Sequence, residues 1–201
     1  MRTFRRSIVL IALTCGSAAL LVACGSSQHP EAVTGPEQQG LAKLVRLSAE
    51  RVMTADTVAA AKWGTAQPID DPARERAVLD AATSQAAERG IDRADVQRIF
   101  EGQITANKTV QRALYAAWES APALRPTARP DLSTEVRPVL DRIDGDLLTA
   151  IQEAQPLLSS PGCGVALDRA KAATAGQMDL DAPHRIGLDQ ALADACVVRP
   201  R

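Results

Sequence analysis

The sequence predicts an all-α fold, a single bundle-like domain of six helices. Aromatic residues make up only 2% of the chain, and alternating runs of β-branched and aromatic residues, which are typical of strands, are missing. Alanine, leucine, valine and isoleucine instead recur at helical spacing, and the 46% hydrophobic content supports one ordinary core. We expect three long helices to form the functional site and two short C-terminal helices to be tied by a disulfide.

Residues 1–23 are expected to be a targeting signal. A basic start with three arginines precedes an apolar segment, which ends in a Leu-Val-Ala-Cys sequence at Cys24. This sequence looks like a bacterial lipobox, which implies cleavage before Cys24, attachment of a lipid to it, and a membrane-anchored protein facing the periplasm or the cell exterior. Residues 24–36 are polar and turn-rich and would form a flexible tether. The alternative is a plain secretory signal and a freely secreted or periplasmic protein.

The first helix of the domain, which spans residues 37–201, is expected over residues 37–63. One of its faces contains Leu44 and Val58 and should be buried, yet the same face carries Arg51 and Lys62. The two cations lie about three helical turns apart and project to the same side. Because unpaired buried charges are costly, these side chains either reach the rim or an acidic partner, or they face an anionic ligand.

A second helix is expected over residues 72–89, with Asp70 or Asp71 as its N-cap. Asp71, Arg74 and Glu75 share one face of its first turn. They form either a solvated charged helix end or one wall of a ligand site.

The third helix, over residues 92–120, has an apolar row that contains Asn107 and Gln111. These two carboxamides must find hydrogen-bond partners. They either tie neighbouring helices together or point neutral donors at a ligand. Three prolines make residues 121–130 an extended connection.

The fourth helix is expected to begin with Asp131 or Ser133 as its cap and to carry Arg137 near its start. Two short helices follow, over residues 163–175 and 184–198.

Two of the four cysteines, Cys15 and Cys24, belong to the signal. Because export leads to an oxidising compartment, the remaining pair, Cys163 and Cys196, is predicted to form a disulfide that joins the beginning of the fifth helix to the end of the sixth. Its stabilisation is about 3–4 kcal/mol on the chain-entropy estimate.

Several function classes are disfavoured. Removing residues 1–23 takes away three arginines and no acid, so the formal net charge falls from −1 to −4, which argues against nucleic-acid binding. The chain has no nucleophile–base pair, phosphate-binding loop or metal-ligand spacing, and no cofactor or metal is expected. His29 and His184 are expected to be ordinary surface histidines.

The inward-facing or cap-facing polar residues are four cations, two acids and two carboxamides. Such a set without a nucleophile suits a small molecule with several carboxylates, since guanidinium groups bind carboxylates in a bidentate manner. In chain order they are Arg51, Lys62, Asp71, Arg74, Glu75, Asn107, Gln111 and Arg137.

This order and spacing resemble the all-helical chorismate mutases of the AroQ class. The export signal, the segment around Asn107, the segment from Pro130 to Asp141 and the late cysteine pair are similar to the exported gamma subclass. The resemblance covers about residues 37–200. It implies an isomerase that converts chorismate to prephenate by a pericyclic rearrangement, without a cofactor.

The resemblance also implies roles for the residues. Arg51, Arg74 and Arg137 would clamp the two carboxylates of chorismate, with Asn107 assisting, and would hold the near-attack geometry. The catalytic group would be Lys62, Gln111, Arg51 and Glu75.

Within that group, Lys62 and Gln111 would donate to the ether oxygen, on which negative charge grows in the transition state. Glu75 would accept from the ring hydroxyl, and Asp71 would orient its neighbours and cap its helix. Two features depart from some exported members: Val78 replaces a polar side chain, and residues 133–135 are one residue longer.

The expected partner is chorismate, and membrane contact is expected only through the lipid at Cys24. The site would be complete within one chain, so a homodimer is compatible with activity but is not required for it. One alternative is a non-catalytic helical lipoprotein that binds a small dicarboxylate. Another is a structural lipoprotein whose polar residues only tie helices together.

Overall fold

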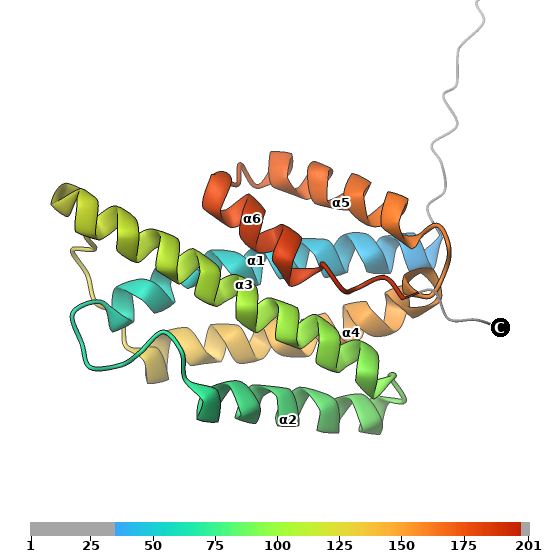
Figure 1. Ribbon diagram of the computed structural model, residues 1–201. Coiled ribbons are helices and arrows are strands. Elements are labelled where there is room, and N and C mark those ends of the chain that lie inside the picture. Colours follow the sequence, from blue (N-terminus) through green and yellow to red (C-terminus); the bar gives the residue numbers. More distant parts are fainter. Residues whose placement is uncertain (1–34, 198–201) are drawn as a thin grey trace, which may run out of the picture. The chain divides into compact units, whose positions relative to one another are not determined.

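The computed structural model describes residues 35–197, and these form a helical bundle without strands, as predicted (Figure 1). The signal segment, Cys24 and nearly all of the predicted tether lie outside the described residues. No helix within 35–197 has the length and apolar character needed to cross a membrane. The elements are α1 (Pro36–Lys62), α2 (Pro72–Arg89), α3 (Arg93–Ser120), a 3-10 turn η1 (Pro122–Leu124), a π-helical turn η2 (Leu132–Val136), α4 (Arg137–Leu158), α5 (Cys163–Gln177) and α6 (Ala182–Ala191).

Helix α1 is the central element, and it packs against α3, α4, α5 and α6 (Figure 1). The face predicted to be inward is buried, including Leu44, Val58 and Arg51. Gly40 allows α4 to approach closely, because a Cβ at this position would lie 2.7 Å from the backbone nitrogen of Ala154. The charged face identified in the sequence therefore lies inside the bundle.

Helix α2 is more loosely held than the long helices around it. It packs on α3 and α4, and only Ala82 and Ala86 of its 18 residues are fully buried. Its N-cap is Asp71, whose Oδ1 accepts from the backbone N–H of Arg74 at 3.0 Å, as predicted. It ends at Gly90, whose φ of 68° suits a left-handed C-cap.

The chain before α4 differs from the single helix predicted there. Asp131 caps residues 132–136 by accepting from the N–H groups of Ser133 and Thr134 at 2.8 Å, but these residues form a π-helical turn. The N–H groups of Val136 and Arg137 reach five residues back instead of four. A π-helical turn accommodates one extra residue within a helix. It spans residues 133–135, the segment expected from the sequence to contain one extra residue.

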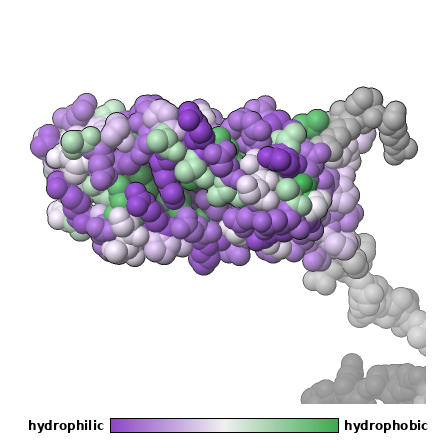
Figure 2. All heavy atoms as spheres, turned by 90° about the horizontal axis from the view of Figure 1, so that it is seen from below, coloured by the Kyte–Doolittle hydropathy of each residue, from purple (hydrophilic) through white to green (hydrophobic). Residues whose placement is uncertain are grey.

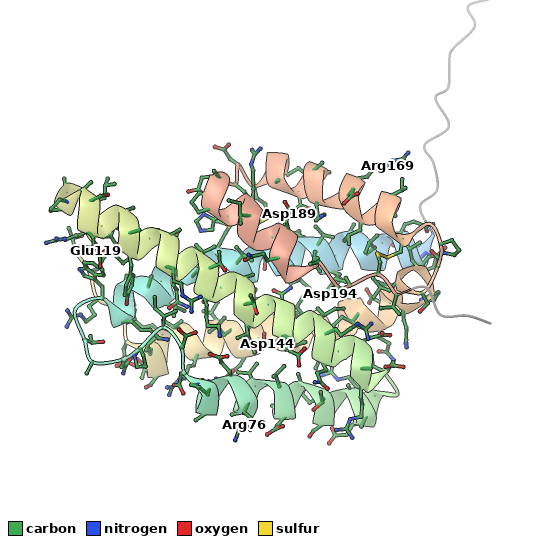
Figure 3. The ribbon with its side chains drawn as sticks, viewed as in Figure 1. Arg76, Glu119, Asp144, Arg169, Asp189 and Asp194 are labelled. Carbon is green, nitrogen blue, oxygen red and sulfur yellow. A yellow bond between two sulfur atoms is a disulfide. The ribbon has the colours of Figure 1, made fainter. Side chains whose placement is uncertain are left out.

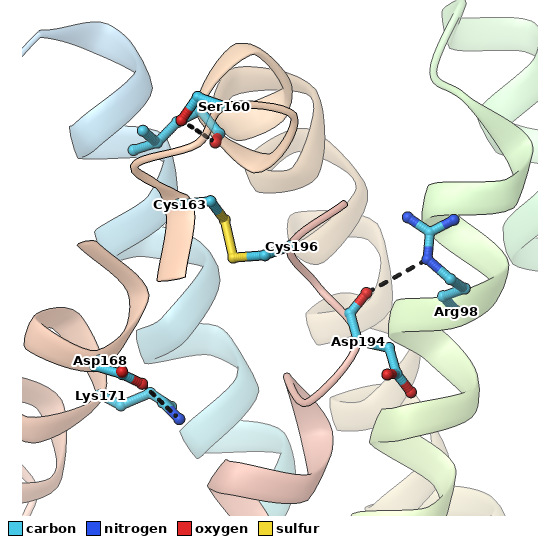
Figure 4. The surroundings of a disulfide bond; sticks show 8 residues. Arg98, Ser160, Cys163, Asp168, Lys171, Asp194 and Cys196 are labelled. Carbon is cyan, nitrogen blue, oxygen red and sulfur yellow. Dashed lines mark hydrogen bonds and ion pairs between the residues drawn. A yellow bond between two sulfur atoms is a disulfide. The ribbon is translucent and has the colours of Figure 1, made fainter. Parts of the chain in front are cut away.

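The C-terminal segment also differs from its prediction. Helix α6 ends at Ala191 rather than near residue 198, and Cys196 lies in the extended segment that follows it. The predicted disulfide is present: Cys163 at the start of α5 is bonded to Cys196, with their Cα atoms 5.7 Å apart (Figure 4). Arg98 of α3 donates its Nε–H to the carbonyl of Asp194 at 3.3 Å. The segment after α6 is therefore held by a disulfide to α5 and by a hydrogen bond from α3.

His184 is buried, so its prediction as a surface residue was wrong. Only 7% of the residue is exposed, and its Nδ1 lies 2.6 Å from Oδ1 of Asp181. Its Nε2 lies 3.2 Å from Oδ1 of Asp56, which belongs to α1. The ion pair with Asp56, aided by Asp181, raises the pKa of His184 to about 9, against the opposing effect of burial. Protonated His184 therefore fastens α6 to α1.

The stability of the protein should fall between about pH 6.5 and pH 9. Since the folded pKa of His184 is raised to about 9 from 6.5, its contribution is fully present below the unfolded pKa. It is lost as the pH rises through the folded pKa. We expect the loss in unfolding free energy to be about 2–3 kcal/mol. Urea unfolding at several pH values measures it. The His184→Gln variant should lack this loss, and an equal loss in the variant would contradict the assignment.

Candidate active site

Helices α1, α2, α3 and α4 enclose a pocket with about 600 Å³ of empty space, including the part open to solvent. Figure 2 shows a hollow with apolar atoms at its floor and hydrophilic atoms around it. The lining includes seven of the eight predicted residues, namely Arg51, Lys62, Asp71, Arg74, Glu75, Asn107 and Gln111.

The eighth predicted residue, Arg137, lies in an adjoining cavity. Its side chain is exposed, and its Nη1 lies 3.5 Å from Oγ of Ser133. The adjoining cavity shares Lys62, Asp71 and Arg74 with the main pocket. Arg137 therefore borders the site and does not line the main pocket.

Arg51 is held from two sides. Its Nε donates to Oδ1 of Asp144 at 2.7 Å and its Nη1 to the carbonyl of Gln103 at 3.3 Å. Only 5% of the residue is exposed. Asp144 projects from α4 into the middle of the bundle and lines the pocket (Figure 3). These contacts fix the plane of the guanidinium, and among the described residues its Nη2 remains without a partner.

Sequence reasoning missed Asp144, although a signal existed. Asp144 lies four residues after Leu140 and three before Leu147, so it is on the apolar row of its own helix. An acid on an inward row of one helix and a cation on an inward row of another predict an ion pair between them.

Lys62 is half-buried at the end of α1. Its ammonium donates to the backbone carbonyls of Pro68 at 2.9 Å and Ile69 at 3.3 Å. Burial lowers the pKa of Lys62, and the nearby carboxylates of Asp71 and Asp70 oppose this effect. Because an ammonium has three donors, one N–H remains for a ligand.

Asn107 ties α3 to α1, which was one of its two predicted interpretations. Its Nδ2 donates at 3.2 Å both to the carbonyl of Arg51 and to Oγ1 of Thr54. Its Oδ1 accepts from Nε2 of Gln111 at 2.7 Å. Among the described residues, the buried Oε1 of Gln111 has no hydrogen-bond partner. Asn107 therefore fixes the position of Gln111, which retains unpaired polar capacity beside the pocket.

Glu75 is held by α3 and by its own helix cap. Its Oε1 accepts from the backbone N–H of Asp71 at 3.2 Å, and its Oε2 lies 2.9 Å from Nζ of Lys108. Lys108 lines the pocket and was also missed. Burial acts in the opposite direction, but hydrogen bonds to Glu75 and Asp70 raise the pKa of Lys108. Arg74 is more loosely placed, with its Nη2 3.6 Å from Asp141.

The arrangement suits binding and charge stabilisation. Four cations, three carboxylates and two carboxamides share the lining with apolar side chains. The cations are Arg51, Lys62, Arg74 and Lys108, and the carboxylates are Asp71, Glu75 and Asp144. The lining contains no serine, cysteine or histidine that could act as a nucleophile with a base. Nor do residues 35–197 include a group of three or more His, Cys, Asp or Glu side chains placed to hold a metal ion. The apolar walls are formed by Val58, Ile69, Val78, Ile104 and Leu140.

Comparisons with known proteins identify similar chains. The profile of the family "Chorismate mutase type II" matches residues 42–112. The secreted chorismate mutase of Mycolicibacterium smegmatis is 37% identical over 163 residues, which are 81% of this chain and 90% of that protein. The secreted chorismate mutase of Mycobacterium tuberculosis is 32% identical over 100% of this chain and 99% of its own. A crystal structure of chorismate mutase from Burkholderia phymatum has a TM-score of 0.76 and 38% identity, and the match covers 81% of this chain and 99% of that one.

Proposed function

Because the chain belongs to the type II chorismate mutase family, we infer that it isomerises chorismate to prephenate in the pocket between α1, α2, α3 and α4. The observation that carries this inference is that Lys62 and Gln111, the two proposed donors to the ether oxygen, line the same pocket as Arg51 and Arg74. A non-catalytic binder of dicarboxylates has no use for donors aimed at a breaking bond. Purely structural ties would not converge on one pocket.

The cations would bind the substrate in its compact form. Chorismate is a dianion whose extended form must fold into a chair-like geometry before its ends can react. Arg51 is suited to hold one carboxylate, because Asp144 and Gln103 orient its guanidinium before the ligand arrives. Arg74 and Arg137 would hold the other from α2 and from the adjoining cavity. Such positioning converts binding energy into a near-attack arrangement.

The remaining donors would act in the transition state. As the C–O bond breaks ahead of C–C bond formation, negative charge grows on the ether oxygen. The free N–H of Lys62 and the second N–H of the Gln111 amide, whose first is donated to Asn107, would donate to that oxygen. Preorganised donors of this kind stabilise the transition state more than the substrate. Glu75, fixed by Lys108, would accept from the ring hydroxyl.

A direct assay tests the function. We expect the purified residues 36–201 to consume chorismate and to yield prephenate, which acid converts to phenylpyruvate. If the folded protein leaves chorismate unchanged while calorimetry detects its binding, the dicarboxylate-binding alternative replaces the enzyme.

The pH dependence of the rate tests the role of Gln111. An amide donates at any pH, so the wild-type kcat should not collapse between mildly acidic and neutral pH. In the Gln111→Glu variant the side chain must be protonated to donate, and kcat should fall about tenfold per pH unit above the pKa of that carboxyl. Kinetics from pH 4.5 to 8 measure both enzymes. Parallel profiles would contradict direct donation by Gln111.

We also propose an exported location, supported by the basic and apolar N-terminal segment and by two relatives named as secreted. The finer proposal is a lipid anchor at Cys24. Fractionation of cells tests it, because the Cys24→Ser variant should be lost from the membrane fraction.

A homodimer remains compatible with the site, because the eight proposed residues belong to one chain.

A further inference from the structure

We propose that Asp70 and Arg112 form a latch that positions Lys62 for catalysis. Asp70 lies in the α1–α2 connection, residues 63–71, and Arg112 lies on α3. Neither residue lines the main pocket. The inference rests on the proposed function, because it assigns positioning residues to the same reaction.

The connection holds the Lys62 ammonium through backbone atoms. The carbonyls of Pro68 and Ile69 accept from Nζ at 2.9 Å and 3.3 Å. Two of the three ammonium donors are thereby directed away from the ligand, and the direction of the third follows from them. Lys62 can donate reproducibly to a substrate only if these carbonyls stay in place.

Contacts within the connection do not by themselves fix the positions of the Pro68 and Ile69 carbonyls. Near its start the N–H of Thr65 donates to the carbonyl of Lys62 and the N–H of Gln67 to Oγ1 of Thr65. Other bonds hold only its two ends: Arg129 donates to the carbonyl of Trp63, and Asp71 caps α2. Gly64, with a φ of 68°, gives the connection a turn that other residues rarely adopt. At its far end the connection joins α2, which buries only two residues fully.

The latch supplies the restraint from outside the connection. Both carboxylate oxygens of Asp70 lie 2.7 Å from Nη2 of Arg112, and Oδ1 lies 3.2 Å from Nζ of Lys108. The hydrogen bond from Arg112, followed by that from Lys108, holds the pKa of Asp70 below its ordinary value. In the described residues, Lys108 and Arg112 are the α3 side chains that bond to the connection. Asp70 adjoins Ile69, so the ion pairs act one residue away from a carbonyl that holds Lys62.

An ion pair of this exposure normally contributes little to stability. Side-chain exposure is 56% for Asp70 and 51% for Arg112. If the pair has only a structural role, its removal should therefore leave the rate unchanged. If it positions Lys62, its removal should lower kcat. Lys62 acts on the transition state, so its misplacement should lower kcat and leave KM nearly constant.

The test is a double-mutant cycle on the full-length chain with Asp70→Asn, Arg112→Gln and the double variant. We expect each single variant to lower kcat by about 3- to 10-fold and the double variant to fall no further, because both changes open the same latch. KM should change by less than about twofold. Asp70→Glu, which keeps the charge, should recover most of kcat.

Arg142 and Asp146 provide the matched control. They form an exposed ion pair on α4, with 58% and 49% side-chain exposure and a distance of 3.1 Å, and neither borders the pocket. Arg142→Gln and Asp146→Asn should leave kcat unchanged. Unchanged kcat in both latch variants, additive losses in the double variant, or a change confined to KM would overturn the proposal.

Hydrogen exchange separates a failed latch from a failed function. The backbone amides of residues 64–71 should exchange faster in Asp70→Asn than in the wild type and in Asp146→Asn. If the wild type makes no prephenate, the proposed function fails, and this measurement alone then decides whether the latch exists. Equal exchange in all three proteins rejects it.

Discussion

Replacement of Lys62 by alanine is expected to lower kcat about 10²- to 10³-fold, the usual effect of removing one preorganised transition-state donor. The ammonium is half-buried and directed by two backbone carbonyls. Its loss leaves the negative charge that grows on the ether oxygen without its cationic donor. The core should remain intact, because Lys62 is the last residue of α1 and its side chain packs at the pocket.

Steady-state kinetics with chorismate measure this loss. The Lys62→Met variant keeps an apolar stem of similar length and should be as inactive as Lys62→Ala, because only the charged donor matters. Lys43→Ala is the matched control, since Lys43 lies on the same helix, pairs with Glu153 at the surface and should be dispensable. A Lys62→Met enzyme with nearly full kcat would remove Lys62 from the mechanism.

Replacement of Arg51 by alanine is expected to have the largest combined effect. The variant loses the best-oriented guanidinium of the pocket and leaves Asp144, whose side chain is only 18% exposed, without its cation. Breaking a buried pair in this way typically costs about 3–5 kcal/mol of stability. We expect kcat/KM to fall at least about 10³-fold, since a desolvated charge-assisted contact to a carboxylate is lost.

The double variant Arg51→Ala/Asp144→Ala separates the two effects. Removing both charges should restore much of the lost unfolding free energy, because no unpaired charge remains, but it should not restore kcat/KM. Chemical denaturation measures the unfolding free energy, and chorismate kinetics measure kcat/KM, for Arg51→Ala and for the double variant. Arg51→Lys should also stay poorly active, as an ammonium lacks the planar fork. Wild-type activity in the double variant would show that Arg51 does not hold substrate.

Much of the fold could be predicted from the helical periodicity and the capping residues of the sequence. The bounds of α2 and α3 were predicted to within one residue, because α2 lies between a capping acid, Asp71, and Gly90, and α3 has a clear apolar row. The errors lie where tertiary contacts override local preference. Helix α6 ends early because the chain must turn so that Cys196 can reach Cys163. The π-helical turn before Arg137 has no periodic signal of its own.

By itself, the sequence determined that one face of α1 is buried and that this face carries charge. Helical spacing placed Arg51 on a buried face, and the ordered set from Arg51 to Gln111 identified the family before any contact was known. Only the tertiary structure decided which group each charged side chain contacts. Asp144 is 93 positions from Arg51, the carbonyls that hold Lys62 belong to a connection without periodicity, and His184 is buried because Asp56 lies opposite it. The reason is physical: spacing along one helix defines its faces, but the partner of each face depends on how the helices cross.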